Sequence, residues 1–208
     1  MNFELPRIYP ITDVRISGLS HAEQVKRLIA GGATLIQLRE KHASPRDFYE
    51  AAVEVIHFAK PLGVKIIIND RVDIAIALKA DGVHLGQDDM PPDMARSILG
   101  NDSIIGFSTH TMEQVSEAMK FQIDYIAYGP VFPTQTKADP DNVVGLNELH
   151  NVRSAIGDIP LVAIGGINEK NLLSVITAGA DSAAMIGSII SETAKIESTI
   201  RRMFQLST

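Results

Sequence analysis

Polar residues that could bind a diphosphate follow one of the short apolar segments of this chain. Gln37, Arg39 and Lys41 alternate after that segment, and a period of two places their side chains on one side of an extended backbone. Arginine offers a planar fork of donors and lysine a compact charge, so together they suit a diphosphate better than a single carboxylate does. The competing interpretation is a solvated loop in which Glu40 is the partner of these cations.

Carboxylates follow two other apolar segments. Asp70 comes with Asn69 directly after residues 66–68, and Asp88 and Asp89 come after residues 83–86. Mg²⁺ usually takes one or two carboxylates and completes its octahedron with water and phosphate oxygens. The spacing therefore favours a metal site, although each of these aspartates could instead cap the helix that follows it.

A long polar loop over residues 129–145 carries Thr134, Gln135, Thr136 and Lys137. Threonine hydroxyls and exposed backbone amides can bind phosphate, and Lys137 adds charge where a leaving diphosphate would need it. Loops of this length in compact domains tend to be functional. The composition alone is that of an ordinary loop, and its combination with the cations described above favours the binding interpretation.

Glycine turns follow the last two apolar segments of the pattern. Gly165 and Gly166 end the first of these, and Ile186 and Gly187 end the second just before a predicted helix. Backbone N–H groups at glycine turns and helix N-termini bind phosphate, and barrels often place a phosphate site after their last two strands. The alternative is a tight turn that needs glycine for its dihedral angles.

Hydroxyl and imidazole side chains add less to the prediction of this site. Ser108 ends the fifth predicted strand and could hydrogen-bond a substrate, and His84 lies between apolar neighbours, so we expect a wall residue with satisfied hydrogen bonds. His110 is ambiguous. The remaining histidines are expected to be solvated: His21, His42, His57 and His150. We find no Ser/His/Asp triad in the sequence.

The scaffold that must bring these residues together is predicted by a repeating pattern. Short β-branched runs alternate with longer amphipathic stretches in eight units, which indicates an α/β fold with a parallel sheet covered by helices. In a single (βα)8 TIM barrel all strands end at one rim, so the polar segments would converge there. An open doubly wound sheet is the alternative, but eight units favour a closed barrel.

The predicted boundaries follow from the apolar pattern and from helix-start and helix-stop residues such as Ser44 and Gly63. A related phrase also recurs before several predicted strands, as in residues 80–82, 123–125 and 180–182, and indicates shared turn chemistry. The strands are expected at residues 8–12, 34–38, 65–68, 82–85, 104–107, 125–128, 161–164 and 183–186. The helices are expected at residues 21–30, 45–60, 71–79, 92–99, 112–120, 146–156, 169–178 and 188–204.

Composition narrows the possible classes of protein. A chain of 208 residues that is 45% hydrophobic is long enough for one sizeable core and short for two, so we expect one catalytic domain over residues 1–208. A net charge of −6 without a basic tract argues against nucleic acid as a partner. The absence of cysteine excludes disulfides and thiolate chemistry. With no signal-type or membrane-spanning segment, we expect a soluble, cytoplasmic protein.

The ordered set of motifs resembles the thiamine phosphate synthase family over nearly the whole chain. Any one motif would be weak, but the set in this order is specific. The motifs occupy residues 9–13, 37–41, 67–73, 81–89, 129–137 and 163–167. The resemblance implies a βα barrel and a reaction of 4-amino-2-methyl-5-hydroxymethylpyrimidine diphosphate with a thiazole phosphate, which yields thiamine phosphate and diphosphate by dissociative departure of the leaving group.

The resemblance also implies a role for individual residues. It assigns the pyrimidine diphosphate to Gln37, Arg39, Lys41, Asn69, Ser108 and Lys137. Of these, Arg39, Lys41, Ser108 and Lys137 would be catalytic. It assigns Mg²⁺ to Asp70 and Asp89, and the thiazole phosphate to Thr134, Gln135, Thr136, Gly166, Ile186 and Gly187. The family usually has serine at the position of Gly187, so a backbone contact survives there but a hydroxyl contact does not.

Three other functions are compatible with parts of the pattern. A thiazole tautomerase would need neither a metal nor a diphosphate site, so residues 87–89 and 134–137 favour the synthase. A non-catalytic thiamine phosphate binding protein would not need both Asp70 and Asp89. A phosphosugar isomerase lacks support because no suitable pair of glutamate and histidine is present. The partners expected are therefore small molecules, and a homo-oligomer is compatible with the sequence.

Overall fold

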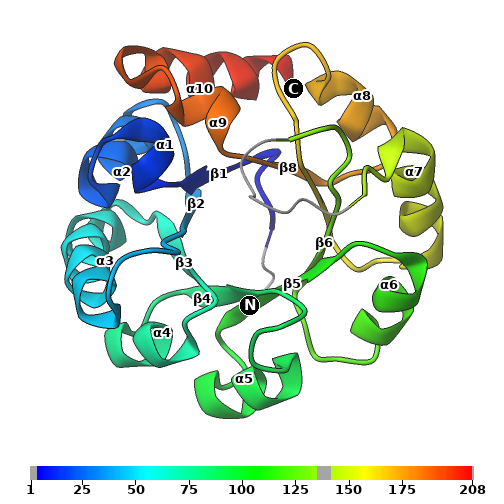
Figure 1. The fold of residues 1–208 in the computed structure, drawn as a ribbon, viewed down its shortest axis with the longest axis horizontal. Helices are drawn as coiled ribbons and strands as arrows, with labels where there is room; N and C mark the ends of the chain where they lie inside the picture. The colour runs from blue at the N-terminus through cyan, green and yellow to red at the C-terminus, as the bar shows by residue number, and fades with distance from the viewer. Residues whose placement is uncertain (1–3, 135–141, 208) are drawn as a thin grey trace.

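The computed structural model describes residues 4–134 and 142–207, and eight parallel strands within them close into a barrel (Figure 1). Closure is made where β1 pairs with β8, with Ile8 beside Ala183 and Pro10 beside Met185. The prediction of a TIM barrel is therefore confirmed, and the open sheet is wrong. The strands are β1 (Ile8–Thr12), β2 (Leu35–Leu38), β3 (Lys65–Asn69), β4 (Gly82–Leu85), β5 (Ile104–Thr109), β6 (Tyr125–Tyr128), β7 (Leu161–Ile164) and β8 (Ser182–Met185).

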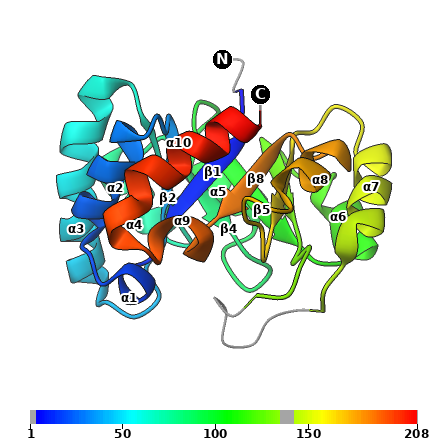
Figure 2. The same cartoon turned by 90° about the horizontal axis from the view of Figure 1, so that it is seen from above.

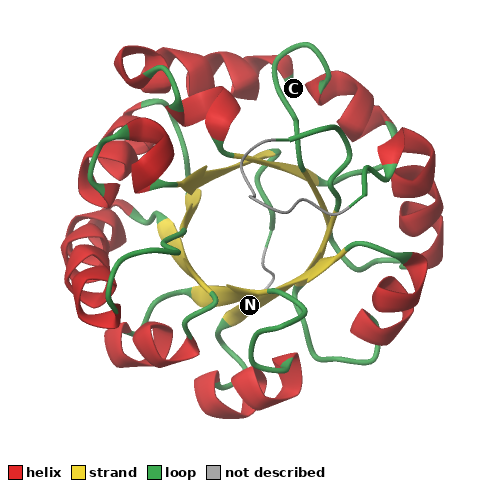
Figure 3. Ribbon diagram, in the orientation of Figure 1, coloured by secondary structure: helices red, strands yellow, loops and turns green. Residues whose placement is uncertain are grey.

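Helices surround the barrel as an outer ring (Figure 3). They are α1 (Val14–Ser17), α2 (His21–Ala30), α3 (Pro45–Ala59), α4 (Val72–Leu78), α5 (Pro92–Leu99), α6 (Met112–Ala118), α7 (Gly145–Ala155), α8 (Leu172–Thr177), α9 (Gly187–Ile190) and α10 (Ile196–Leu206). Two 3₁₀ segments are η1 (Lys60–Leu62) and η2 (Thr193–Lys195). Ser44 begins α3 by accepting a hydrogen bond from the backbone N–H of Asp47, as its sequence predicts.

Two apolar shells hold the fold together because successive strand residues face opposite sides of the sheet. In β2, Leu35 belongs to the cluster inside the barrel, whereas Ile36 belongs to the cluster between sheet and helices. In β3, Ile67 faces inward, with Ile66 and Ile68 facing the helices. Strands buried on both faces have continuous runs of apolar residues, so their positions can be predicted from the sequence.

The two ends of the barrel are built differently. Leu5, in the segment before β1, packs against the interior cluster, and Figure 2 shows this segment at the end opposite to α1. That second end is the one at which all strands terminate, and we call it the mouth. Each residue predicted to bind substrate or metal lies in or after a strand at the mouth, or falls outside the described residues.

The C-terminal part differs from its prediction. One helix was expected over residues 188–204, but α9 ends at Ile190 and α10 begins at Ile196. Between them lies η2, where the carbonyl of Thr193 accepts hydrogen bonds from the Ile196 N–H and from the Arg27 guanidinium, the latter at 2.7 Å. α10 then packs closely on α2, since a Cβ at Gly31 would lie 2.1 Å from the Ile200 side chain.

Smaller differences have local causes. The sequence reading missed α1, which Asp13 caps by accepting hydrogen bonds from the N–H groups of Arg15 and Ile16. The helix expected from residue 169 begins at Leu172, because Asn171 accepts a hydrogen bond from the Asn168 N–H just before it. β8 begins and ends one residue earlier than expected, and β5 extends two residues further.

No helix within residues 4–134 and 142–207 combines the length and the apolar character that a bilayer crossing requires.

Candidate active site at the barrel mouth

Two cations that follow β2 each pair with an aspartate from a neighbouring strand end. The Arg39 guanidinium donates to the carboxylate of Asp13, and the Lys41 ammonium donates to Asp70 at 2.5 Å. The partners follow β1 and β3, so these pairs connect three neighbouring strand ends. Glu40 instead accepts hydrogen bonds from the N–H groups of the next turn and pairs with neither cation. The interpretation of an isolated loop with Glu40 as partner is therefore wrong.

The two predicted metal ligands lie together. Burial raises the pKa of Asp89, and the adjacent Asp70 carboxyl raises it further, against the opposing effects of the Gly86 N–H and the Lys41 charge. The Gly86 N–H donates to Asp89 Oδ2 at 2.6 Å. Asp70 adopts a left-handed backbone with a φ of 61°, as Lys79 does at the end of α4, and this conformation costs free energy for residues other than glycine.

Neither aspartate caps a helix. α4 begins after Arg71 and α5 after Pro91, in both cases without a side-chain cap. The capping alternative is thus wrong for Asp70 and for Asp89, and both carboxylates remain available at the mouth. Across the described part of the chain, no group of three or more His, Cys, Asp or Glu side chains could hold a metal ion. A pair of carboxylates suits Mg²⁺, which keeps waters and phosphate oxygens as its other ligands.

Asn69 ends β3 with its amide buried. The side-chain nitrogen has no hydrogen-bond partner within the part of the chain that the structure describes, and the residue is 6% exposed. A buried donor left without a partner costs about 1–3 kcal/mol. At the mouth, such a donor indicates an acceptor supplied by a ligand, in keeping with the predicted contact to the pyrimidine diphosphate.

A chain of polar side chains runs through the interior below Asn69. Ser108 Oγ lies 2.8 Å from Nε2 of His84, and Nδ1 of His84 lies 3.0 Å from the Tyr125 hydroxyl. Tyr125 contacts the hydroxyl of Tyr9 at 3.1 Å, to which the Gln37 amide donates at 3.2 Å. The chain therefore joins Gln37 and Ser108, two residues predicted to bind the same substrate, from opposite sides of the barrel.

His84 has its hydrogen bonds satisfied, as the sequence predicts, but its partners were not foreseen. Burial lowers the pKa of His84 to about 4, so the imidazole is neutral at pH 7. Its ring stacks on Tyr125 with centroids 5.6 Å apart and an interplanar angle of 13°. Ser108 lies near the end of β5, as predicted, and its hydroxyl lies against this ring.

The glycine turn after β7 is shaped by a close contact. Gly165 and Gly166 have φ angles of 100° and 65°, and a Cβ on Gly166 would lie 2.5 Å from the Pro133 carbonyl oxygen. The Gly166 carbonyl accepts hydrogen bonds from the side chains of Asn168 and Asn171. The fold by itself thus requires glycine here, and the turn supports the loop that carries the predicted phosphate-binding threonines.

The turn after β8 behaves differently. Ile186 precedes α9, and its carbonyl accepts the N–H groups of Ile189 and Ile190. A Cβ on Gly187 would lie 3.5 Å from the Ser191 hydroxyl oxygen, an ordinary contact. Packing therefore does not demand glycine at this position. A short helix that begins after β8 is the usual place for a phosphate in barrels of this type.

Part of the predicted site lies outside the described residues. Gln135, Thr136 and Lys137 belong to this part, so their predicted roles stay predictions. Thr134 is the last residue described before it and is half-buried.

One histidine prediction is wrong. His21 was expected to be solvated, but it is 3% exposed, and its Nδ1 lies 2.7 Å from the Thr12 hydroxyl. Glu40 lies 3.5 Å from its Nε2. The reason is its position: as the first residue of α2, directly after the Ser20 cap, it turns back onto the end of β1.

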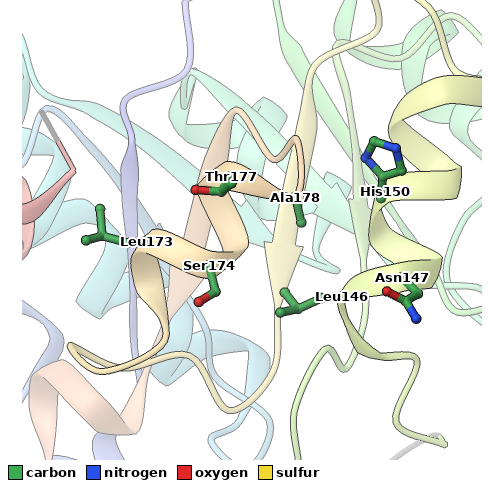
Figure 4. A pocket seen from close by; sticks show the side chains of 7 residues that line it. All are labelled: Leu146, Asn147, His150, Leu173, Ser174, Thr177 and Ala178. Atoms are coloured by element: carbon green, nitrogen blue, oxygen red, sulfur yellow. The ribbon is translucent and has the colours of Figure 1, made fainter.

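Two surface grooves lie away from these residues. Figure 4 shows one of about 460 Å³ lined by α7 and α8, with Leu146, His150 and Leu173 among its residues. A second, of about 630 Å³, is lined by Arg96, Lys120 and their neighbours beside α5 and α6. Neither contains a residue predicted to bind substrate. Converging charge and buried donors, and not a concave shape, locate the candidate site at the mouth.

Three side chains at the site were missed in the sequence. Asp13 holds Arg39, and a carboxylate directly after the first strand is the signal that could have found it. Tyr9 and Tyr125 are buried inside the barrel, and an inward-facing phenol in a small barrel needs a polar partner. Tyr9 and Gln37 lie on the paired strands β1 and β2, but His84 and Tyr125 lie on β4 and β6, which do not pair, so no spacing indicates the second contact.

Comparisons with known proteins agree with this geometry. A family model described as thiamine monophosphate synthase matches residues 8–189. The chain is 45% identical over 200 residues to the thiamine-phosphate synthase of Syntrophomonas wolfei, which covers 96% of this chain and 95% of that protein. It is 48% identical over 185 residues to that of Clostridium novyi, with 88% and 90% covered. The solved thiamine phosphate pyrophosphorylase from Pyrococcus furiosus superposes with a TM-score of 0.86 at 35% identity, over 97% of this chain and 95% of that one.

Proposed function

The chain belongs to the thiamine monophosphate synthase family, and we propose that its mouth joins 4-amino-2-methyl-5-hydroxymethylpyrimidine diphosphate to a thiazole phosphate in a reaction that needs Mg²⁺ and releases diphosphate. The observation that carries this proposal is the convergence of two cations and two adjoining carboxylates on neighbouring strand ends: Arg39, Lys41, Asp70 and Asp89. This set suits a metal-bound diphosphate.

Arg39 and Lys41 would bind the diphosphate, with Lys137 as a third cation. In the structure both described cations are held by aspartates, which fixes their direction at the mouth. An incoming diphosphate can take over these donors, because phosphate oxygens accept charge-assisted hydrogen bonds as carboxylates do. The buried Asn69 amide and the hydroxyl of Ser108 would bind the pyrimidine part, together with Gln37.

Asp70 and Asp89 would hold Mg²⁺ between the ends of β3 and β4. The donor chemistry fits the ion, since two carboxylates whose mutual proximity raises a pKa are stabilised by a shared cation. When bound, Mg²⁺ would neutralise negative charge on the departing diphosphate.

The proposed reaction is dissociative. Departure of diphosphate leaves a resonance-stabilised pyrimidine cation, which the thiazole nitrogen then captures. No covalent nucleophile is required, in keeping with a chain that contains no cysteine. Arg39, Lys41 and Lys137 would stabilise the leaving group in the transition state, and fixed charges of this kind are usually the largest contribution to such catalysis.

The thiazole phosphate would lie on the opposite side of the mouth, after β7 and β8. The backbone N–H groups that bind it would come from Gly166, Ile186 and Gly187. The adjoining loop would bind the same phosphate through Thr134, Gln135 and Thr136. The environment of Gly187 is compatible with this assignment, because a Cβ there would make only an ordinary contact with Ser191 and packing does not explain the glycine.

The test is diphosphate release from the two substrates, measured with Mg²⁺ and with a chelator, beside chromatographic detection of thiamine phosphate. We expect both products in equal amounts, and only with the metal. Equal rates with chelator would remove Mg²⁺ from the proposal. Tight binding of thiazole phosphate without any turnover would instead favour a tautomerase or a non-catalytic binding protein.

A further inference from the structure

We propose that the backbone N–H of Ile167 is a further donor to the thiazole phosphate, and that Asn168 and Asn171 are positioning residues that fix its direction. The inference rests on the proposed function, because the phosphate belongs to the second substrate of that reaction. It adds a donor beside Gly166 and gives a task to two side chains outside the predicted site. The evidence lies in the peptide groups of the glycine turn after β7.

The peptide group between Gly166 and Ile167 is held from one side. Its carbonyl oxygen accepts hydrogen bonds from the side-chain nitrogens of Asn171 at 3.1 Å and of Asn168 at 3.3 Å. The only cis peptide bond among the described residues lies elsewhere, at Pro130, and in a planar trans peptide the N–H and the C=O point in opposite directions. The Ile167 N–H therefore points away from both asparagines.

This N–H group is buried and unpaired. Ile167 is 4% exposed, and its N–H has no acceptor among the described residues. The Gly166 N–H has none there either, and the carbonyl of its own peptide group accepts the Phe132 N–H at 3.1 Å. Buried backbone N–H groups are nearly always paired, so these two indicate an acceptor that is not yet bound. A phosphate offers several acceptor oxygens and suits two adjacent backbone donors.

The two asparagines can act only as donors toward the turn. Asn171 Oδ1 accepts the Asn168 N–H at 2.8 Å, and Asn168 Oδ1 accepts the Lys170 N–H at 2.9 Å. A carboxamide has one oxygen and one nitrogen, so both nitrogens must face the Gly166 carbonyl. The backbone of glycine rotates easily, and a flipped peptide would place this carbonyl where the Ile167 N–H now lies. Two donors on the oxygen oppose that flip.

Asn171 does not have the usual role of its position. It directly precedes α8, where an asparagine side chain commonly caps the helix by accepting an N–H of the first turn. Its side chain makes no such hydrogen bond and contacts Asn168 and Gly166 instead. The residue thus serves the turn and not the helix, which supports a task at the phosphate.

The direct test is a titration of the full-length, ¹⁵N-labelled protein with inorganic phosphate and with the thiazole phosphate, followed by ¹H–¹⁵N spectra. We expect the amide protons of both Gly166 and Ile167 to move downfield. The thiazole alcohol without its phosphate, and sodium chloride at equal ionic strength, are the controls and should cause no such shift. A shift at Gly166 alone, or at neither residue, would overturn the inference.

The titration does not depend on turnover. Shifts at both residues in a protein that forms no thiamine phosphate would support the phosphate site at this turn and contradict the proposed synthase. Turnover without a shift at Ile167 would do the reverse. The failure of one proposal is therefore distinguishable from the failure of the other.

Variants test the positioning role. Asn168→Ala combined with Asn171→Ala should raise the KM for thiazole phosphate about tenfold, the loss expected for a hydrogen bond to a charged group, with the KM for pyrimidine diphosphate unchanged. A merely structural role would move both KM values together. Asn147→Ala on the exposed side of α7 is the matched control. Should the double variant not fold, Asn168→Ala alone keeps the closer donor, and a rise of about threefold is expected. An unchanged KM for thiazole phosphate in the folded variant would contradict the role of the asparagines.

Discussion

The two ends of the barrel use aspartate in opposite ways. At the end opposite to the mouth, each of three carboxylates accepts a hydrogen bond from the backbone N–H near the start of the preceding strand: Asp81 from Ile66 (2.8 Å), Asp124 from Ile105 (2.7 Å) and Asp181 from Leu161 (2.8 Å). Two of the three also pair with arginine, at 2.8 Å from Arg96 to Asp124 and from Arg153 to Asp181. This device explains the phrase that recurs before strands in the sequence.

At the mouth the carboxylates are less completely satisfied. Asp70 and Asp89 adjoin each other, and the pKa of Asp89 is raised by burial and by that neighbour. Asp70 also has the strained backbone described above. Charges satisfied by their surroundings indicate a contribution to stability, whereas charges in mutual repulsion indicate a partner that the protein does not itself provide. The comparison teaches that environment, and not residue type, separates scaffold from site.

The largest effect is expected at the mouth. Asp89→Asn keeps an oxygen for the Gly86 N–H but removes a charge needed for the metal, so turnover should fall by about 100-fold, a typical loss for one such electrostatic contribution. Thermal stability without metal should stay equal or rise, because repulsion from Asp70 is relieved. Steady-state kinetics and thermal unfolding of the same preparation measure both.

Asp88→Asn is the matched control for that prediction. Asp88 is the exposed neighbour of Asp89, and the same change there should leave turnover within about twofold. Equal losses in the two variants, or a clear loss of stability in Asp89→Asn, would mean that the mouth carboxylates belong to the scaffold and would remove the distinction between the two ends.

The opposite result is expected at the other end. Asp124→Ala leaves the Ile105 N–H without its acceptor and removes the carboxylate partner of the Arg96 guanidinium, which is 10% exposed and otherwise donates only to backbone carbonyls such as those of Gln122 and Ser103. We expect unfolding free energy to fall by about 2–3 kcal/mol, with turnover per folded molecule unchanged well below the unfolding temperature. Urea denaturation followed by circular dichroism measures the first quantity. A variant of normal stability with reduced turnover would contradict the assignment of this end to structure.

Much of the fold could be predicted from the sequence because its determinants are local. Strands buried on both faces form continuous apolar runs, and glycine and Ser–Pro signals mark the helix ends. The split of the last helix was not predicted, and it lies where the Thr193 carbonyl contacts Arg27, a residue 166 positions earlier that no local pattern connects to it. The solvated environment assigned to His21 was wrong for a similar reason: contacts with Thr12 and Glu40 are set by packing between elements.

The candidate site was predictable as far as side chains follow strand ends. Arg39, Lys41, Asp70 and Asp89 lie together because parallel strands share a mouth. What the sequence could not reveal is which groups contact each other across the barrel, such as the Tyr125 hydroxyl and His84, whose 41-residue separation carries no periodic signal. Asp13 could have been placed at the mouth because it follows the first strand, but its pairing with Arg39 from the next strand carries no such signal.

The smallest of the three effects is expected where scaffold and site meet, at Arg39. Arg39→Ala should lower turnover at least about tenfold, or about 1.4 kcal/mol in transition-state stabilisation, because one cation for the leaving diphosphate is lost. Stability should change little, since Asp13 keeps its hydrogen bonds to the N–H groups of α1. Kinetics with varied pyrimidine diphosphate measure the loss, and Arg46→Ala on the exposed face of α3 controls for removal of a positive charge. Unchanged turnover in Arg39→Ala would mean that the Arg39–Asp13 pair has only a structural role, as the aspartates at the other end of the barrel have.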